Sequence, residues 1–350
     1  MDKIDKRKNL DEVSFIRPIL IIFLVTYHAF APWCGAWVPF EGYTENETYF
    51  WIAKTSYSFM LPMFVFISGY VWGYQREKLH KDDSFKILVQ KKFSRLYVPA
   101  MVFGLLFYAI FTCDYSDISL SQFTQAGWLI IQGYKHMWFL PMLFWCFIVL
   151  YMILKIRNEY MKVATLGFLF ALCILPFPFQ IESTFYYLPF FYLGYKSISF
   201  SDKLKECSTP INSLIMTACF IVVFVLGCFL SDKVSEYIAD QNLVVKYAGH
   251  LANRMISVCY GTLGIYMLLF VANGFTCKHQ LPEFILNIGN YCFGVYIFQQ
   301  FLLYIVYYYS ATPCYVSRNA LPWIGFIIAL LLSLALSWGL RQTKIGKRLI

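Results

Sequence analysis

The feature that most limits the fold of this chain is a succession of apolar segments. A helix needs about 20 apolar residues to cross a bilayer, and about ten segments approach that length. They lie near residues 14–34, 57–74, 97–113, 137–154, 163–179, 184–198, 212–230, 255–275, 284–309 and 320–340. Some are short for a full crossing, notably 184–198. The pattern predicts an all-α fold, a polytopic membrane helical bundle of about ten transmembrane helices.

The composition agrees with a membrane protein. Hydrophobic residues make up 59% of the chain and charged residues 14%, against roughly 25% charged residues in soluble domains. No loop is long enough for a second globular domain, so we expect residues 1–350 to form a single membrane domain. The net charge of +9 is spread between apolar segments, which argues against nucleic-acid binding. The 11 cysteines lack a C-x-x-C pair, so we expect no disulfide framework and no metal site.

The basic residues orient the bundle. With the N-terminus inside, most of the 29 lysines and arginines fall in cytoplasmic segments. The outer segments hold only Lys54, Lys135, Lys233, Lys246, Arg254 and Arg318. This bias predicts that both termini are cytoplasmic. It also makes residues 231–254 an outer loop. The basic N-terminus leads straight into a long apolar segment without a cleavage site, so we expect the first span to be retained.

The first span carries two polar residues, Arg17 and His28. They are eleven positions apart, which on a helix is about three turns and roughly 16 Å along one face. Pro18 suits the first turn of such a helix. An arginine and a histidine are costly in hydrocarbon, so we expect this face to line a cavity. Arg17 would then lie at the cytoplasmic end and His28 in the outer half of the membrane.

Three roles are open to an intramembrane histidine such as His28: structural hydrogen bonding, a proton relay or general-base catalysis. A second basic site, Lys92 and Arg95, has a three-residue spacing that places both side chains on one helix face. They could bind phosphates through charge-assisted hydrogen bonds, or they could determine the membrane topology and contact anionic lipid. Coenzyme A thioesters fit these positions, with the phosphates at Arg17, Lys92 and Arg95 and the reactive carbonyl at His28. The acceptor hydroxyl would then attack that carbonyl.

Other polar, aromatic and small residues give further predictions. His136 and Trp138 open the fourth segment, at a depth close to that of His28, either as interfacial residues facing water or beside the acceptor. The aromatic residues of loop 35–56 are membrane anchors or stack on sugar rings. Gly69 and Gly73 predict a close helix crossing. Gln299 and Gln300 are expected to be buried and to hydrogen-bond inside the bundle.

Several motifs are spread along the chain: Arg17 and His28, the run Phe59–Tyr70, the segment Lys92–Pro99 with Arg95, the segment His136–Leu140 with Trp138, the run Tyr186–Gly194, and the run Tyr291–Tyr296. Together they resemble the motifs of the acyltransferase-3 family of bacterial integral membrane O-acyltransferases. They cover most of the chain in the family's order. Gln299 departs from the pattern, because many relatives carry a histidine there.

The resemblance implies transfer of an acyl group, usually acetyl from acetyl-CoA, to a hydroxyl of a cell-surface saccharide or its lipid-linked precursor. It implies that His28 is catalytic and that Arg17, Lys92 and Arg95 bind the acyl donor. His136 and Trp138 are the acceptor-side candidates. Acyl-CoA is a co-substrate and no bound cofactor or metal is expected. The expected partners are acyl-CoA, the glycan acceptor and membrane lipid, and the expected location is the bacterial cytoplasmic (inner) membrane.

Two alternatives from other classes stay open. One is a glycan exporter or flippase without acyl chemistry, and the other is a membrane partner subunit whose ionisable residues are structural. The chain has no Walker-type Gly-Lys-Ser/Thr motif, which argues against ATP-driven transport by this chain alone. The sequence leaves the acceptor sugar, the acyl chain and the oligomeric state open.

Overall fold

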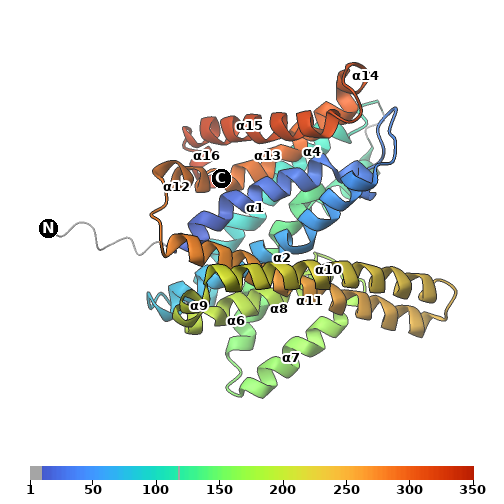
Figure 1. Ribbon diagram of the computed structural model, residues 1–350. Coiled ribbons are helices and arrows are strands. Elements are labelled where there is room, and N and C mark those ends of the chain that lie inside the picture. Colours follow the sequence, from blue (N-terminus) through green and yellow to red (C-terminus); the bar gives the residue numbers. More distant parts are fainter. Residues whose placement is uncertain (1–9, 117–118) are drawn as a thin grey trace. The chain divides into compact units, whose positions relative to one another are not determined.

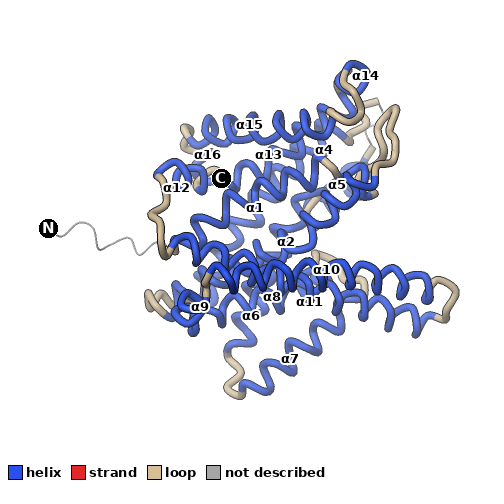
Figure 2. Tube along the Cα trace, viewed as in Figure 1, coloured by secondary structure: helices blue, strands red, loops and turns tan. Residues whose placement is uncertain are grey.

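The computed structural model describes residues 10–116 and 119–350, and these are helices joined by loops, with no strand (Figure 2). The predicted all-helical class is confirmed. The chain divides into two compact units. Unit 1 contains the residues up to Phe64, Phe200–Leu226 and Cys259–Gly339; unit 2 contains Val65–Ser199, Gly227–Val258 and Leu340–Ile350. The boundaries fall inside helices α2, α10, α11 and α15, and each unit is described below by itself (Figure 1).

Unit 1 is built around its N-terminal helix, α1 (Asp11–Ala29). The other elements are the 3-10 turn η1 (Ala31–Cys34), α9 (Ser201–Cys207), α12 (Glu283–Gly289), α13 (Cys292–Tyr304), the π-helical turn η6 (Ile305–Tyr309) and α14 (Thr312–Tyr315). The first part of α2 (Glu47–Glu77), parts of α10 (Pro210–Ile238) and α11 (Leu243–Thr276), and most of α15 (Leu321–Arg341) complete it.

Helix α1 begins earlier than its apolar residues suggest. Asp11 and Glu12 occupy its first turn, where negative charge is favoured by the helix dipole. Glu12 is buried and pairs with Lys205 of α9 at 3.4 Å. Pro18 therefore lies inside the helix and not in its first turn, so that prediction is wrong. The helix ends at Ala29 and η1 follows, so the predicted span 14–34 is a helix plus a separate turn.

Helices α1 and α13 pack side by side and run in the same direction (Figure 1). Near their N-terminal ends, Arg17 lies within electrostatic range of Cys292. At the other end, the Tyr307 hydroxyl donates a hydrogen bond to the carbonyl of Ala29. This pairing places the end of α1, and with it His28, beside the last turns of the α13–η6 segment.

Unit 2 contains the rest of α2 and most of the central part of the chain. Its other elements are α3 (Phe85–Lys92), the π-helical turn η2 (Phe93–Tyr97), α4 (Val98–Phe111), α5 (Leu120–Gln132), the 3-10 turn η3 (Lys135–Trp138), α6 (Phe139–Leu154), α7 (Glu159–Ala171), η4 (Leu172–Ile174), α8 (Ile181–Ser197) and α16 (Gly346–Leu349). η5 (Ile198–Phe200) crosses the boundary to unit 1. Helix α6 packs mainly on α8.

Three glycines bring α2 and α8 into backbone contact. A Cβ added to Gly69 would lie 2.1 Å from the carbonyl oxygen of Phe191, and one added to Gly194 would lie 2.1 Å from that of Phe66. At Gly73 the closest backbone oxygen, that of Tyr195, would be at 2.6 Å. No side chain fits at these positions, so the close crossing predicted from Gly69 and Gly73 is confirmed, with Gly194 as their counterpart.

Within the described residues, 8 helices are long and apolar enough to cross a membrane. The predicted segments 163–179 and 184–198 correspond to α7 and α8, which have 13 and 17 residues. The count of ten crossings and the cytoplasmic position of both ends stay predictions. The expected outer loop 231–254 is mostly helical, because α10 extends to Ile238 and α11 starts at Leu243. Both helices exceed the ~30 Å hydrocarbon thickness.

Candidate active site

His28 lies in the last turn of α1, with 8% of its surface exposed. Aromatic rings flank its imidazole on two sides. The ring of Tyr27 meets it edge to face at 4.9 Å, and the indole of Trp37 stacks on it at 5.9 Å with an interplanar angle of 29°. Tyr27 is in turn packed on Tyr57 of α2, with ring centroids 4.6 Å apart. Unit 1 therefore holds His28 in an aromatic enclosure.

The chain reversal after η1 brings Trp37 back over His28. Gly35 has a φ of 74°, a left-handed conformation that favours glycine. The amides of Ala36 and Trp37 both donate to the carbonyl of Ala31, at 3.1 and 3.4 Å. The only sequence signal for this placement was the glycine directly after η1, which marks a reversal without fixing where the next residues pack.

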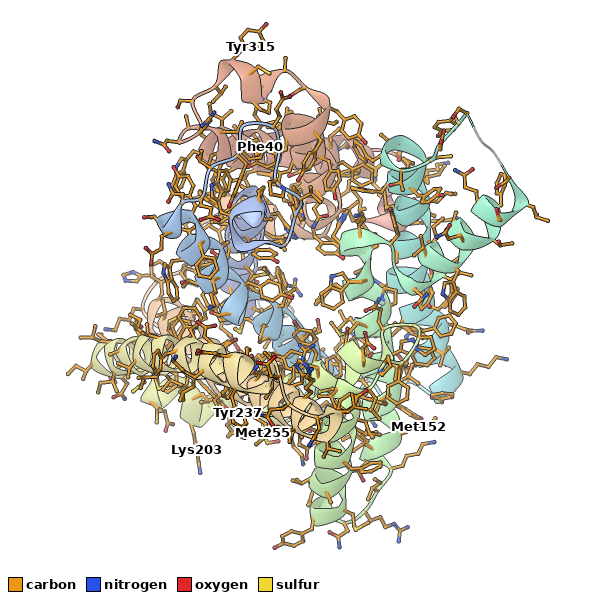
Figure 3. The ribbon with its side chains drawn as sticks, turned by 90° about the vertical axis from the view of Figure 1, so that its right-hand side faces the viewer. Phe40, Met152, Lys203, Tyr237, Met255 and Tyr315 are labelled. Carbon is orange, nitrogen blue, oxygen red and sulfur yellow. The ribbon has the colours of Figure 1, made fainter. Side chains whose placement is uncertain are left out.

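The end of α13 and the π-helical turn Ile305–Tyr309 contact this loop and hold it in place. The Tyr308 hydroxyl donates to the carbonyl of Val38 at 2.6 Å, and the ring of Tyr304 lies 4.9 Å from that of Trp37. Tyr307 stacks on Phe40 (labelled in Figure 3) at 5.4 Å. Such π-turns are rare in proteins, and those that do occur are often found at functional sites. Within this turn Tyr307 contacts both α1 and the loop, and Tyr308 contacts the loop.

Two other aromatic residues, one in η1 and one in the predicted loop 35–56, are buried and hydrogen-bonded within unit 1. Trp33 is buried and donates its indole N–H to the carbonyl of Thr44 at 3.0 Å. Tyr49 is buried and donates its hydroxyl to the carbonyl of Asn319 at 2.7 Å. Trp37 differs from them, because it is half-buried and lies against the candidate catalytic side chain.

Arg17 lies on the same helix as His28 and is exposed. The unbroken helix keeps the two residues within about 20° of one face and roughly 16 Å apart along the axis. The structure thus confirms the relation that was predicted from their spacing. It also distinguishes the two side chains, since His28 is enclosed by the protein and Arg17 is accessible.

The three-residue spacing of Lys92 and Arg95 does not place them on a common α-helical face. Helix α3 ends at Lys92, and the π-helical turn Phe93–Tyr97 contains Arg95. A π-helix has more residues per turn, so a step of three no longer returns to the same side. The Lys92 ammonium lies 3.6 Å from the ring centroid of Phe147 on α6, whereas Arg95 is exposed.

Part of the positive charge near this turn is neutralised within unit 2. Arg76 pairs with Asp82 at 2.9 Å, and Lys91 pairs with Asp83 at 2.7 Å. Lys92, which is half-buried, and Arg95 are the two cations predicted to bind phosphate, and neither takes part in these salt bridges. Whether Arg17 in unit 1 acts together with them stays a prediction.

His136 is buried, with 5% of its surface exposed, so the prediction of a solvent-facing interfacial histidine is wrong. Its ring lies 5.7 Å from that of Phe107 on α4, at an angle of 69°. Trp138 is half-buried, and its ring lies 6.1 Å from that of Tyr187 on α8. Unit 2 therefore places both acceptor-side candidates in η3, at the start of α6.

A strained turn positions these two residues. Gly133 has a φ of 89° and Lys135 a φ of 50°; the second is a left-handed conformation unusual for lysine. A Cβ on Gly133 would lie 2.7 Å from the Cα of Trp138. Backbone strain of this kind persists where the surroundings enforce it, often at functional sites. The glycine is required both for its conformation and for its closeness to η3.

A cluster of aromatic rings continues from Trp138 to the buried Tyr186 and Tyr187 of α8. Tyr187 contacts Tyr186 edge to face at 4.7 Å, and the guanidinium of Arg254 lies 4.7 Å above the Tyr186 ring. The sequence placed Tyr186 and Tyr187 in a motif and Arg254 in an outer segment, and nothing linked them. Their association depends on packing between α8 and α11 residues within unit 2.

Gln299 on α13 is completely buried, and neither polar atom of its amide has a hydrogen-bond partner among the described residues. The predicted burial of Gln299 and Gln300 is confirmed, but the predicted hydrogen bonding is wrong for Gln299. Buried polar groups without partners are few in folded proteins.

No group of three His, Cys, Asp or Glu residues in the described part of the chain is arranged to hold a metal ion.

The long apolar helices of the described residues define the class first, a multi-pass helical membrane protein, in which His28 is a buried ionisable residue. A family model described as an acyltransferase domain matches residues 10–342. The chain belongs to this family, the acyltransferase-3 family, and the resemblance inferred from its motifs is confirmed. No curated protein and no solved structure matched the chain.

Proposed function

We propose that this acyltransferase-family protein is a membrane-embedded O-acetyltransferase. It moves an acetyl group from cytoplasmic acetyl-CoA to a hydroxyl of a cell-surface saccharide or of its lipid-linked precursor, in the bacterial inner membrane. His28 acts as the general base. The observation that carries the proposal is the aromatic enclosure of His28 at the end of α1, on the same helix as the exposed Arg17.

The enclosure suits general-base catalysis. A base must keep a fixed orientation toward the proton that it accepts, and the rings of Tyr27 and Trp37 restrict the imidazole of His28 on two sides. Apolar walls also exclude water, which would otherwise hydrolyse the thioester. A solvated histidine would have neither advantage.

The reaction follows from these roles. The neutral imidazole of His28 accepts the proton of the acceptor hydroxyl as its oxygen attacks the thioester carbonyl. The tetrahedral intermediate then collapses, the C–S bond breaks, and the imidazolium returns a proton to the leaving thiolate. The products are the O-acetyl ester and free coenzyme A, and His28 is again neutral. No metal or bound cofactor takes part in this proposal.

Donor binding is assigned to Arg17, Lys92 and Arg95. Two of these side chains are exposed arginines, which bind phosphates through charge-assisted hydrogen bonds. The axial separation of Arg17 and His28, roughly 16 Å, allows an extended pantetheine arm to lie between a phosphate and the base. Trp138 supplies an aromatic face for the acceptor, because such faces stack on sugar rings, and His136 lies beside it in the same turn.

The test is thiol release from acetyl-CoA by the full-length protein in lipid nanodiscs, with a saccharide acceptor from the host envelope. We expect His28→Ala to lower the transfer rate about 100-fold to 10,000-fold, the usual contribution of a general base. His250→Ala, at an exposed histidine of α11, is the matched control and should leave the rate unchanged.

Two further readouts separate this proposal from its alternatives. Envelope glycans from cells that express His28→Ala should lack the acetyl units found with the wild type. Normal acetylation of envelope glycans by a correctly inserted His28→Ala protein would contradict the proposal. A glycan exporter without acyl chemistry would release no thiol with either protein, so the same assay distinguishes that candidate.

A further inference from the structure

We propose that unit 2 binds one hydrocarbon chain of an anionic phospholipid in a groove between α6, α7 and α8, with the lipid phosphate beside Arg157. The groove has a volume of about 420 Å³, within the ~300–1,000 Å³ of small-molecule sites. Its lining includes Trp145, Val149, Met152, Ile156, Leu169 and Phe185. None of the residues assigned to catalysis or donor binding lines this groove, so the inference does not depend on the proposed acyl transfer.

The walls of the groove offer hydrocarbon contacts and almost no hydrogen bonds. The one hydroxyl in the lining, that of Thr165, already donates to the carbonyl of Met161 at 2.8 Å. The indole nitrogen of Trp145 has no hydrogen-bond partner among the described residues, but it is buried and not accessible from the groove. A polar ligand would lose its hydrogen bonds to water without replacement, whereas an alkyl chain would lose none.

The exposed side chains of α7 support a hydrocarbon environment around the groove. Its outward side chains include Met161, Val163 and Phe168, which are 56%, 59% and 65% exposed. A helix that is apolar both outward and toward its groove is suited to a hydrocarbon environment. Helix α7 has 13 residues. Met152 of α6, labelled in Figure 3, lines the groove and is 44% exposed.

The charge at one end of the groove selects an anionic lipid. Ile156 lines the groove, and Arg157 follows it in the turn between α6 and α7. In the described part of the chain no carboxylate lies within salt-bridge distance of the exposed Arg157, whereas nearby Lys162 is paired with Glu159 at 2.7 Å. This turn is predicted to be cytoplasmic, and the cytoplasmic leaflet carries the anionic phospholipids that basic residues attract.

The groove is tested by native mass spectrometry of the full-length protein in detergent, titrated with phosphatidylglycerol or with phosphatidylethanolamine of the same chains. We expect one phosphatidylglycerol to bind more tightly than phosphatidylethanolamine. Val149→Trp fills the groove and should remove this adduct. Val222→Trp, at an exposed valine of α10 outside the groove, is the matched control and should retain it. If Val149→Trp fails to fold, the milder Leu169→Phe replaces it.

A second pair of variants tests the head group. Arg157→Gln should reduce the preference for phosphatidylglycerol about fivefold, the equivalent of the ~1 kcal/mol that one basic residue contributes at an anionic membrane surface. Lys203→Gln, at an exposed lysine of α9, should leave the preference for phosphatidylglycerol unchanged. An adduct that persists in both groove-filling variants would overturn the proposal. A prenyl phosphate bound in place of phospholipid, or a protein partner on this face, would also overturn it.

Discussion

The indole of Trp37 stacks on the imidazole of His28, with ring centroids 5.9 Å apart and planes inclined by 29°. The two residues come from different elements, the end of α1 and the loop after η1. The loop is fastened by the Tyr308 hydroxyl on the Val38 carbonyl. Trp37 is thus held against the imidazole of the candidate base by contacts of its own loop.

The first prediction concerns Trp37 as a positioning residue. Trp37→Ala should lower kcat about tenfold or more, because the imidazole of His28 loses a wall that limits its orientation. Trp37→Phe keeps an aromatic face and should recover most of the rate. Steady-state acetyl transfer with varied acceptor measures both. Equal rates for Trp37→Ala and wild type would show that the stacking is only structural.

Donor binding gives the second prediction. Arg17→Gln and Arg95→Gln should each raise the KM for acetyl-CoA about tenfold, since a charge-assisted hydrogen bond contributes about 1.5–3 kcal/mol. The KM for the acceptor should stay near the wild-type value. Lys92→Met retains a long stem on the Phe147 ring and removes only the charge. Unchanged donor KM in all three variants would remove these residues from the donor site.

The third prediction concerns the crossing of α2 and α8. Gly69→Ala puts a methyl group 2.1 Å from the Phe191 carbonyl oxygen, so the helices must separate, and we expect a loss of about 1–3 kcal/mol as for overpacked cores. Gly167→Ala on α7 meets no atom within 4 Å and should stabilise by up to about 1 kcal/mol through helix propensity. Thermal unfolding in detergent compares the two variants. A Tm of Gly69→Ala equal to that of wild type would contradict the crossing.

The turn before η3 gives the fourth prediction. Gly133→Ala requires a left-handed alanine and a displacement of Trp138, whose Cα lies 2.7 Å from the added Cβ. We expect a lower affinity for the saccharide acceptor, seen as a raised acceptor KM, with the donor KM unchanged. Gly127→Ala on the nearby α5, where the added methyl is in open space, is the control. A donor effect as large as the acceptor effect would argue against an acceptor-side role for η3.

The fifth prediction is a pH dependence. Hydrogen bonds from Lys162 and Lys196 hold the pKa of Glu159 below its usual value of 4.5. A carboxyl whose folded-state pKa is depressed stabilises the fold above its unfolded pKa, and this contribution is lost as the pH falls through the folded value. Glu159→Gln should therefore lower Tm at neutral pH and match wild type under strongly acidic conditions. A difference that is independent of pH would show that the charge is not responsible.

Much of the fold could be predicted from the sequence, because lipid-length apolar segments have few alternatives to helices. The relation of Arg17 to His28 was also predictable, since it depends only on the pitch of one helix. The relation of Lys92 to Arg95 was not, because a π-turn interrupts the helix between them. The burial of His136 and the stacking of Trp37 depend on neighbours that lie far away or across a chain reversal.

The sequence by itself determined the helical membrane class, the family motifs and the alignment of Arg17 with His28, because these follow from local periodicity and residue order. Only the tertiary structure decided which aromatic ring covers His28, which cation lies over Phe147, and where α2 touches α8. Those relations arise from packing between segments that are distant in the chain or that meet across a chain reversal. Local propensity does not encode them, because a single turn such as the one at Gly35 changes the direction of the chain and so decides where the next residues pack.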